Sequence, residues 1–114
     1  MKSPDRNTVK KLSDLPNIGK AISADLELIN ITNPKQLVGC DAFHLHADLC
    51  VALGFRQDYC VIDVLLSAID FMEGGEAKPW WSFTPERKQR MARLPILKEP
   101  SINRVINKVR VKIQ

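Results

Sequence analysis

Several features that define common protein classes are missing from this 114-residue sequence. No apolar run approaches the roughly 20 residues that a membrane-spanning helix needs, and no apolar segment follows the polar residues 1–6, so we expect no signal peptide. Cysteine is scarce and odd in number, with three residues, which argues against a disulfide framework. Internal repeats and low-complexity stretches are also absent. These absences predict a cytoplasmic protein with reduced thiols, and we expect no cofactor.

Positive charge is distributed unevenly along the chain. The formal net charge is +4, but residues 85–114 hold nine basic and two acidic side chains, a charge of +7, whereas residues 1–84 carry −3. A basic segment on a slightly acidic body favours a polyanionic partner, although a solvated segment that aids only solubility gives the same pattern. We therefore divide the chain into a helical domain, 1–84, and a basic C-terminal extension, 85–114.

The pattern of apolar and turn-forming residues predicts an all-α fold. Hydrophobic residues make up 45% of the chain, as in folded globular proteins. Helical periodicity and capping residues predict a compact bundle of about five helices, with Asp41 and Thr84 as N-caps of two of them. The predicted helices are 3–11, 21–29, 41–53, 57–73 and 85–94, with a short turn at 34–38. Residues 101–113 fit either a helix or a strand.

Residues 12–26 resemble a helix-hairpin-helix motif, whose core pattern is Leu-Pro-Gly-Ile-Gly. Here the sequence reads Leu-Pro-Asn-Ile-Gly at positions 15–19. We expect Ile18 to pack between the two helices and Gly19 to permit a backbone geometry and a close approach that a Cβ would block. Asn17 replaces the first glycine of the family pattern, but asparagine tolerates left-handed geometry better than most residues.

The resemblance implies contact with DNA through the backbone. In that family the amides at the start of the second helix bind one DNA phosphate, where unpaired N–H groups and the positive end of the helix dipole coincide. By position this role falls to the segment Asn17, Ile18, Gly19, Lys20 and Ala21. Such contacts position a duplex without reading its bases. The alternative is that the hairpin only packs helices together.

The chain also resembles a small bacterial family known as pathogenicity locus or mitomycin resistance proteins. The matching segments are 15–26, 49–50, 55–63 and 79–81. The resemblance extends over about residues 8–90, implies a relation to the C-terminal domain of the competence regulator TfoX, and implies a role near DNA damage or repair. Position 46 departs from it, because the family has tyrosine where this sequence has His46.

A second candidate DNA contact lies in the basic extension. Residues three apart on a helix lie broadly on one side, so we expect Arg87, Arg90 and Arg93, together with Lys88, to track a phosphate backbone. A solvated helix face is the alternative.

Other residues suggest metal binding, catalysis or base stacking. The spacing C-x3-H-x-H-x3-C at 40–50 suggests zinc, but His44 and His46 would point about 160° apart on one helix, so we expect no metal site. Cys60 as a reactive thiol and Asp41 as a glycosylase carboxylate are weaker alternatives, because no base stands near the thiol and the chain is short for base flipping. The aromatic residues Trp80, Trp81 and Phe83 either stack on unpaired bases or close the core.

The sequence therefore favours a sequence-independent DNA-binding module that is not itself an enzyme. A further protein partner in repair or recombination fits the same interpretation. The competing hypothesis is a protein-interaction adaptor, in which the hairpin is scaffold and the basic extension docks on an acidic partner.

Overall fold

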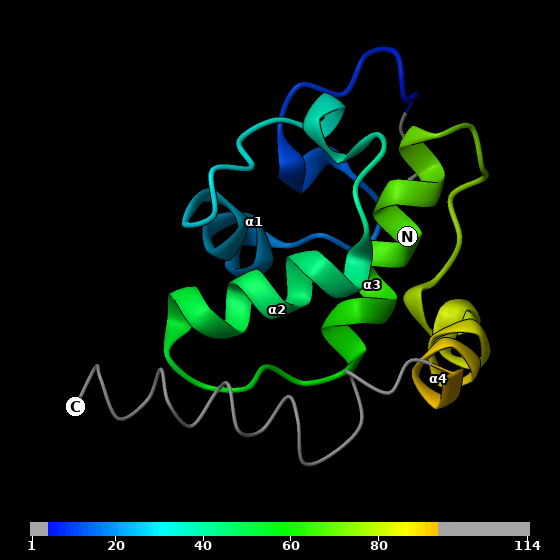
Figure 1. The fold of residues 1–114 in the computed structure, drawn as a ribbon. Helices are drawn as coiled ribbons and strands as arrows, with labels where there is room; N and C mark the ends of the chain where they lie inside the picture. Colours follow the sequence, from blue (N-terminus) through cyan, green and yellow to red (C-terminus); the bar gives the residue numbers. More distant parts are fainter. Residues whose placement is uncertain (1–4, 94–114) are drawn as a thin grey trace.

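The computed structural model describes residues 5–93, and this part of the chain folds into helices and connecting turns without a strand (Figure 1). The predicted all-α class is confirmed. Its elements are η1 (Leu12–Asp14), α1 (Lys20–Glu27), η2 (Pro34–Leu37), α2 (Ala42–Leu53), α3 (Cys60–Met72), η3 (Trp80–Phe83) and α4 (Thr84–Arg93), where η denotes a 3-10 helix. The predicted alternatives for 101–113 lie outside the described residues. None of the described helices is long and apolar enough to cross a membrane.

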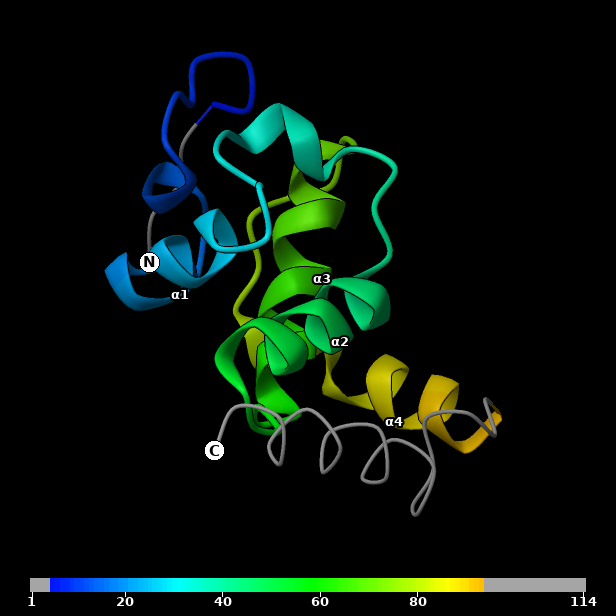
Figure 2. The same ribbon diagram turned by 60° about the vertical axis from the view of Figure 1, so that its left-hand side comes forward.

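Helix α3 is the centre of the fold. Every residue from 62 to 69 is buried, and α2 and η3 are the helical elements that pack most extensively against it. Leucines from η1, the hairpin, α1 and η2 complete the core. Figures 1 and 2 show α1 and α4 on opposite sides of α3. This arrangement separates the two segments that the sequence analysis assigned to DNA contact.

Side chains cap the starts of α2 and η2, and the Asp41 cap of α2 was predicted. The Asp41 carboxylate accepts a hydrogen bond from the Phe43 amide (2.8 Å) at the start of α2, and Gly54 ends this helix in the left-handed conformation (φ 82°). Asn33 caps η2 by accepting from the Lys35 amide (3.0 Å). Each of these boundaries depends on a residue within a few positions of it.

The predicted helix 3–11 is wrong over the described residues 5–11, which form a turn and an extended segment before η1. The amides of Lys10 and Lys11, which a helix would pair with carbonyls one turn earlier, donate to the Asp14 carboxylate instead (3.2 and 3.0 Å). The same segment is held to α3 by Arg6. Its guanidinium donates to the carbonyl oxygens of Phe71 (2.8 Å) and Gly75 (2.6 Å), and it lies over the Phe71 ring. Phe71 lies in the last turn of α3 and Gly75 follows the helix, so Arg6 ties the N-terminal segment to the end of α3. The element before the hairpin is therefore the three-residue η1, and the two-helix form of the helix-hairpin-helix motif is not confirmed.

Other predicted boundaries shift because their residues bond elsewhere. The long helix begins at Cys60 rather than residue 57, since the Gln57 carbonyl accepts from His46 (3.0 Å) and the Gln57 amide donates to the sulfur of Cys50 (3.3 Å). Helix α1 ends at Glu27, before the predicted 29, and buries only Leu26 along its length.

Candidate nucleic-acid interface

The hairpin between η1 and α1 is held by buried side chains and by Asn17. Leu15 and Ile18 are at most 1% exposed, which confirms the predicted burial of Ile18. Asn17 adopts the left-handed conformation (φ 69°) that its side chain was expected to tolerate. Its amide nitrogen Nδ2 also donates to the Ser67 hydroxyl (3.1 Å) and to the Lys78 carbonyl (2.7 Å). Sequence reasoning missed these two bonds, which tie the hairpin to α3 and to the segment that follows it.

Gly19 does not have the internal role that the sequence analysis expected. Its backbone is extended (φ −96°, ψ −173°), a conformation open to any residue. A Cβ added at this position would meet nothing within 4 Å. The expectation of a special geometry at Gly19 is therefore wrong, because Asn17 supplies the left-handed turn. Nothing inside the described part of the protein requires the absence of a side chain at Gly19.

The start of α1 presents hydrogen-bond donors at the surface. Gly19 is the N-cap and has no side chain to accept from the first-turn amides, which have no carbonyl partner one turn earlier in the helix. Gly19, Lys20 and Ala21 are all exposed. The Ile18 amide, in contrast, donates to the Leu15 carbonyl within the turn (3.4 Å). Of the predicted segment, Gly19, Lys20 and Ala21 thus have the exposure that a phosphate contact needs.

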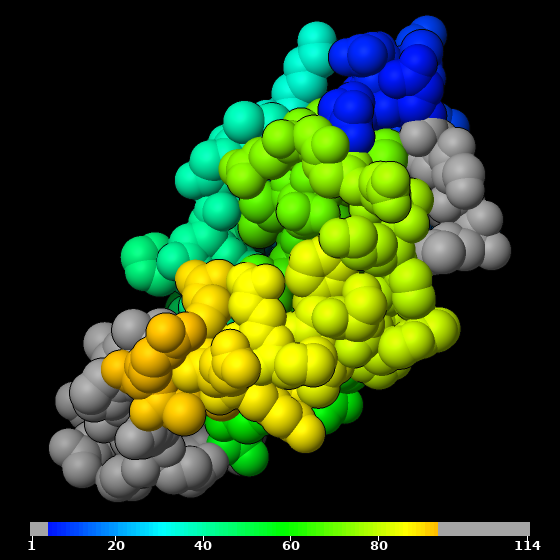
Figure 3. Space-filling view, turned by 90° about the vertical axis from the view of Figure 1, so that its right-hand side faces the viewer, coloured from blue at the N-terminus to red at the C-terminus, as the bar shows by residue number. Residues whose placement is uncertain are grey.

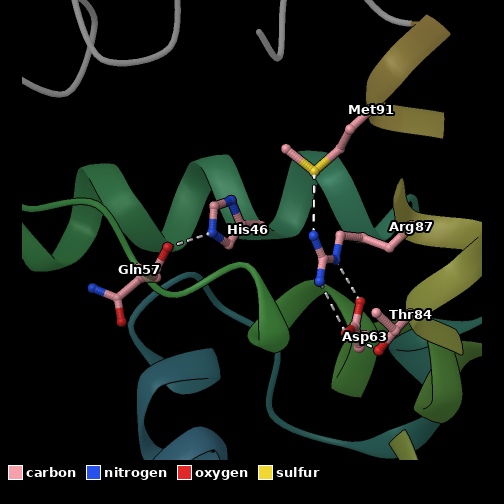
Figure 4. Close-up of polar contacts among 6 residues, drawn as sticks. All are labelled: His46, Gln57, Asp63, Thr84, Arg87 and Met91. Carbon is pink, nitrogen blue, oxygen red and sulfur yellow. Dashed lines mark hydrogen bonds and ion pairs between the residues drawn. The ribbon is translucent and has the colours of Figure 1, made fainter. Parts of the chain in front are cut away.

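The side chain of Arg87 is bonded within the fold (Figure 4). Its Nε donates to Oδ1 of Asp63 (2.8 Å), whose side chain is completely buried, and the Thr84 hydroxyl donates to Oδ2 (2.7 Å). The guanidinium also lies over the Tyr59 ring and contacts the sulfur of Met91. Thr84 is helical and directs its hydroxyl to Asp63, so its predicted role as N-cap is wrong. A carboxylate in the apolar run 61–66 was the sequence signal for such a buried pair.

The remaining basic residues of α4 differ in exposure. Arg90 lies over the Phe43 ring and pairs with Asp41 (3.6 Å) and Glu86 (3.5 Å). Lys88 and Arg93 are exposed. Helix α4 contacts α3 and η3, so residues 85–93 of the predicted extension lie against the helical body. The rest of that extension, 94–114, lies outside the described residues.

A hollow of about 380 Å³ lies between α2, α3 and α4. Four carboxylates and one guanidinium line it, with an apolar floor that includes Leu66, Ile69 and Phe83. The charged lining residues are Asp41, Asp70, Glu73, Glu86 and Arg90. This excess of negative charge disfavours phosphate, so the hollow does not extend the candidate interface.

The cysteine and histidine residues of the 40–50 segment do not converge. Nε2 of His46 donates to the Gln57 carbonyl, while the sulfur of Cys50 lies 3.9 Å from the imidazole. The Cys40 thiol instead donates to the Gln36 carbonyl, and His44 is exposed. Within residues 5–93 no group of three or more His, Cys, Asp or Glu residues is placed to hold a metal ion. Burial lowers the pKa of His46 and raises the pKa of the Cys50 thiol.

The two residues considered for catalysis have structural surroundings. Burial, followed by the negative charges of Asp58 and Asp63, raises the pKa of the Cys60 thiol, the reverse of what a nucleophilic thiolate requires. Asp41 caps α2 and pairs with Arg90. Neither arrangement resembles a reactive centre.

Comparison with known proteins identifies the family of this chain. A family model described as pathogenicity locus matches residues 5–89, and the chain belongs to this family. It is 41% identical over 81 residues to the mitomycin resistance protein McrB of Streptomyces lavendulae. The aligned region covers 71% of this chain and 77% of the relative. No solved structure matches significantly. The relation to TfoX stays a prediction.

Proposed function

We propose that this chain binds DNA without sequence preference, with the start of α1 holding one backbone phosphate. The observation that carries the proposal is Gly19, an exposed N-cap without a side chain, at which a Cβ would meet nothing in the described protein. An open N-cap leaves the first-turn amides accessible to an anion, and the helix dipole favours negative charge there. The exposed Lys20 adds a cation directly beside them.

The similarity to a mitomycin resistance protein supports a link between this binding and resistance to mitomycin or DNA repair. The proposal gives the chain a binding role and no reaction, which fits the structural surroundings of Cys60 and Asp41 described above. Helix α4, which carries Lys88 and Arg93, lies on the opposite side of α3 from α1 (Figures 1 and 2). These two residues therefore add general attraction for a polyanion rather than a second contact beside the same phosphate.

The salt dependence of binding to a labelled short duplex tests this proposal. The logarithm of the affinity should fall linearly with the logarithm of salt concentration, by about 0.9 for each phosphate contacted. Lys20→Glu should lower the affinity and reduce this slope by about one contact. Lys35→Glu, the same charge change on exposed η2, is the control and should have a smaller effect.

A second variant, Gly19→Asp, separates binding from folding. Aspartate is at least as good an N-cap as glycine, so the unfolding temperature should stay the same or rise. The carboxylate occupies the anion position and repels phosphate, so duplex affinity should fall. If Lys20→Glu and Gly19→Asp both leave duplex binding at the level of Lys35→Glu, the hairpin is scaffold and the adaptor hypothesis replaces this proposal.

A further inference from the structure

The aromatic residues of η3 divide between the core and the surface. Trp80 and Phe83 are partly buried and pack against the core cluster. Trp81, between them in sequence, is 61% exposed, the highest value among the large hydrophobic residues that the structure describes as exposed. The fold therefore uses two of these aromatic side chains and leaves the third in water. An exposed aromatic ring offers a face on which a nucleic-acid base can stack.

The backbone around Trp81 is well fixed. Pro79 restricts the entry to η3, and both the amide and the hydroxyl of Ser82 donate to the Pro79 carbonyl (3.1 and 2.8 Å). The edge of one indole faces the other, with ring centres 5.6 Å apart and planes at 83°. Because η3 packs closely on α3, the Trp81 indole is presented on a rigid support. A rigid support lowers the entropic cost of binding.

The segment that carries Trp81 is joined to the hairpin. Asn17 donates to the Lys78 carbonyl at 2.7 Å, and Figure 3 shows the chain from residue 75 to α4 spread over one continuous face of the molecule. Gly19 is two residues after Asn17, and Trp81 is three residues after Lys78. At about 3.5 Å per residue, a few nucleotides of a DNA strand can bridge the two positions. Lys20 and Lys78 are exposed cations on the two joined segments.

We infer that Trp81 stacks on an unpaired base of a DNA strand whose phosphate is held at the start of α1. The preferred ligand is then DNA with an unpaired base, such as a bulge, gap or single-stranded junction, rather than an intact duplex. Every base has an aromatic face, so this contact gives structural preference without sequence preference. The inference rests on the proposed function, since the hairpin must bring the strand to the indole.

Competition binding with three DNA probes tests this inference. The probes are a labelled duplex, the same duplex with one extra unpaired thymine, and one of its single strands. The full chain should bind the bulged duplex about tenfold more tightly than the intact one, a typical size for one stacked base. Trp81→Ala should remove this preference and leave the affinity for the intact duplex unchanged, while Trp81→Tyr should retain part of it.

Phe55→Ala is the matched control, because Phe55 is also about half exposed (51%) but lies in the connection between α2 and α3. It should keep the full preference for the bulged probe. If the wild-type chain shows no preference, or if Trp81→Ala keeps it, the inference is wrong. Lys20→Glu separates the stacking inference from the proposed function. If this variant weakens binding to the intact duplex but the wild-type chain shows no preference for the bulge, the proposed function stands and the stacking inference fails. Absence of binding to all three probes overturns both.

Discussion

His44 and His46 lie two residues apart on α2, and their surroundings differ completely. His44 is exposed, whereas His46 is buried against Tyr59 and donates to the Gln57 carbonyl. Because a carbonyl oxygen only accepts, Nε2 of His46 carries the ring proton. Burial lowers the pKa of His46 below its ordinary value of 6.5, and its hydrogen bonds offset only part of this effect. The neutral ring is thus the form that the fold selects.

His46 should make the stability of the protein depend on pH. Below about pH 6.5 the unfolded chain binds a proton at His46 while the folded chain resists it, so the free energy of unfolding should fall as the pH decreases. The fall is at most about 1.4 kcal/mol per pH unit for one group. Urea unfolding at pH 7.5, 6.5 and 5.5 measures it. His46→Gln should flatten this dependence, and His44→Gln should not; equal behaviour of the two variants would contradict the assignment.

At the scale of secondary-structure elements, α4 is attached through one buried carboxylate. Asp63 accepts from both Thr84 and Arg87 at the start of α4. A buried ion pair is a weak source of net stability, but removing one partner leaves the other charge unpaired. The attachment of α4 therefore depends on both members being present.

Asp63→Ala should lower the free energy of unfolding by about 3–5 kcal/mol and increase hydrogen exchange along α4. Glu86→Ala is the control, since the side chain of Glu86 is 51% exposed and its pair with Arg90 is long (3.5 Å); such surface pairs contribute about 0–1 kcal/mol. Denaturant unfolding of the two variants gives the comparison. A similar small loss for both would show that α4 is held by its apolar contacts.

At the scale of the whole molecule, all of the net positive charge lies beyond α4. Residues 94–114 hold five basic and one acidic side chain, a formal charge of +4, so residues 1–93 are formally neutral. The fold that carries the hairpin thus has no overall attraction for DNA. Under the proposed function, affinity for DNA is expected from local groups of the fold, with general electrostatic attraction from the last 21 residues.

A chain shortened after Arg93 tests this division of roles. It retains Thr84 and Arg87, so the attachment of α4 to Asp63 should persist. Duplex affinity and the salt slope should both fall as cationic residues are lost. In this shortened chain, Lys20→Glu should still weaken the DNA binding that remains. If shortening removes every effect of Lys20→Glu, the binding is charge attraction by residues 94–114 alone.

The sequence by itself determined the features that depend on neighbouring residues. The all-α class, the Asp41 cap, the end of α2 at Gly54 and the left-handed turn at Asn17 were readable because each involves side chains and backbone groups a few positions apart. The burial of Ile18 followed from its apolar character within a turn. For the candidate site, this local information identified the hairpin and its exposed amides.

Only the tertiary structure decided which partners distant residues find. Arg6 binds the end of α3, Arg87 binds Asp63, and Asn17 binds Lys78, across 65, 24 and 61 positions of the chain. A cationic or polar side chain has the same local pattern whether it faces water or a buried acceptor, and the choice depends on which groups the packed core leaves unpaired. This is why Arg87 belongs to the fold and why the hairpin and the Trp81 segment are neighbours.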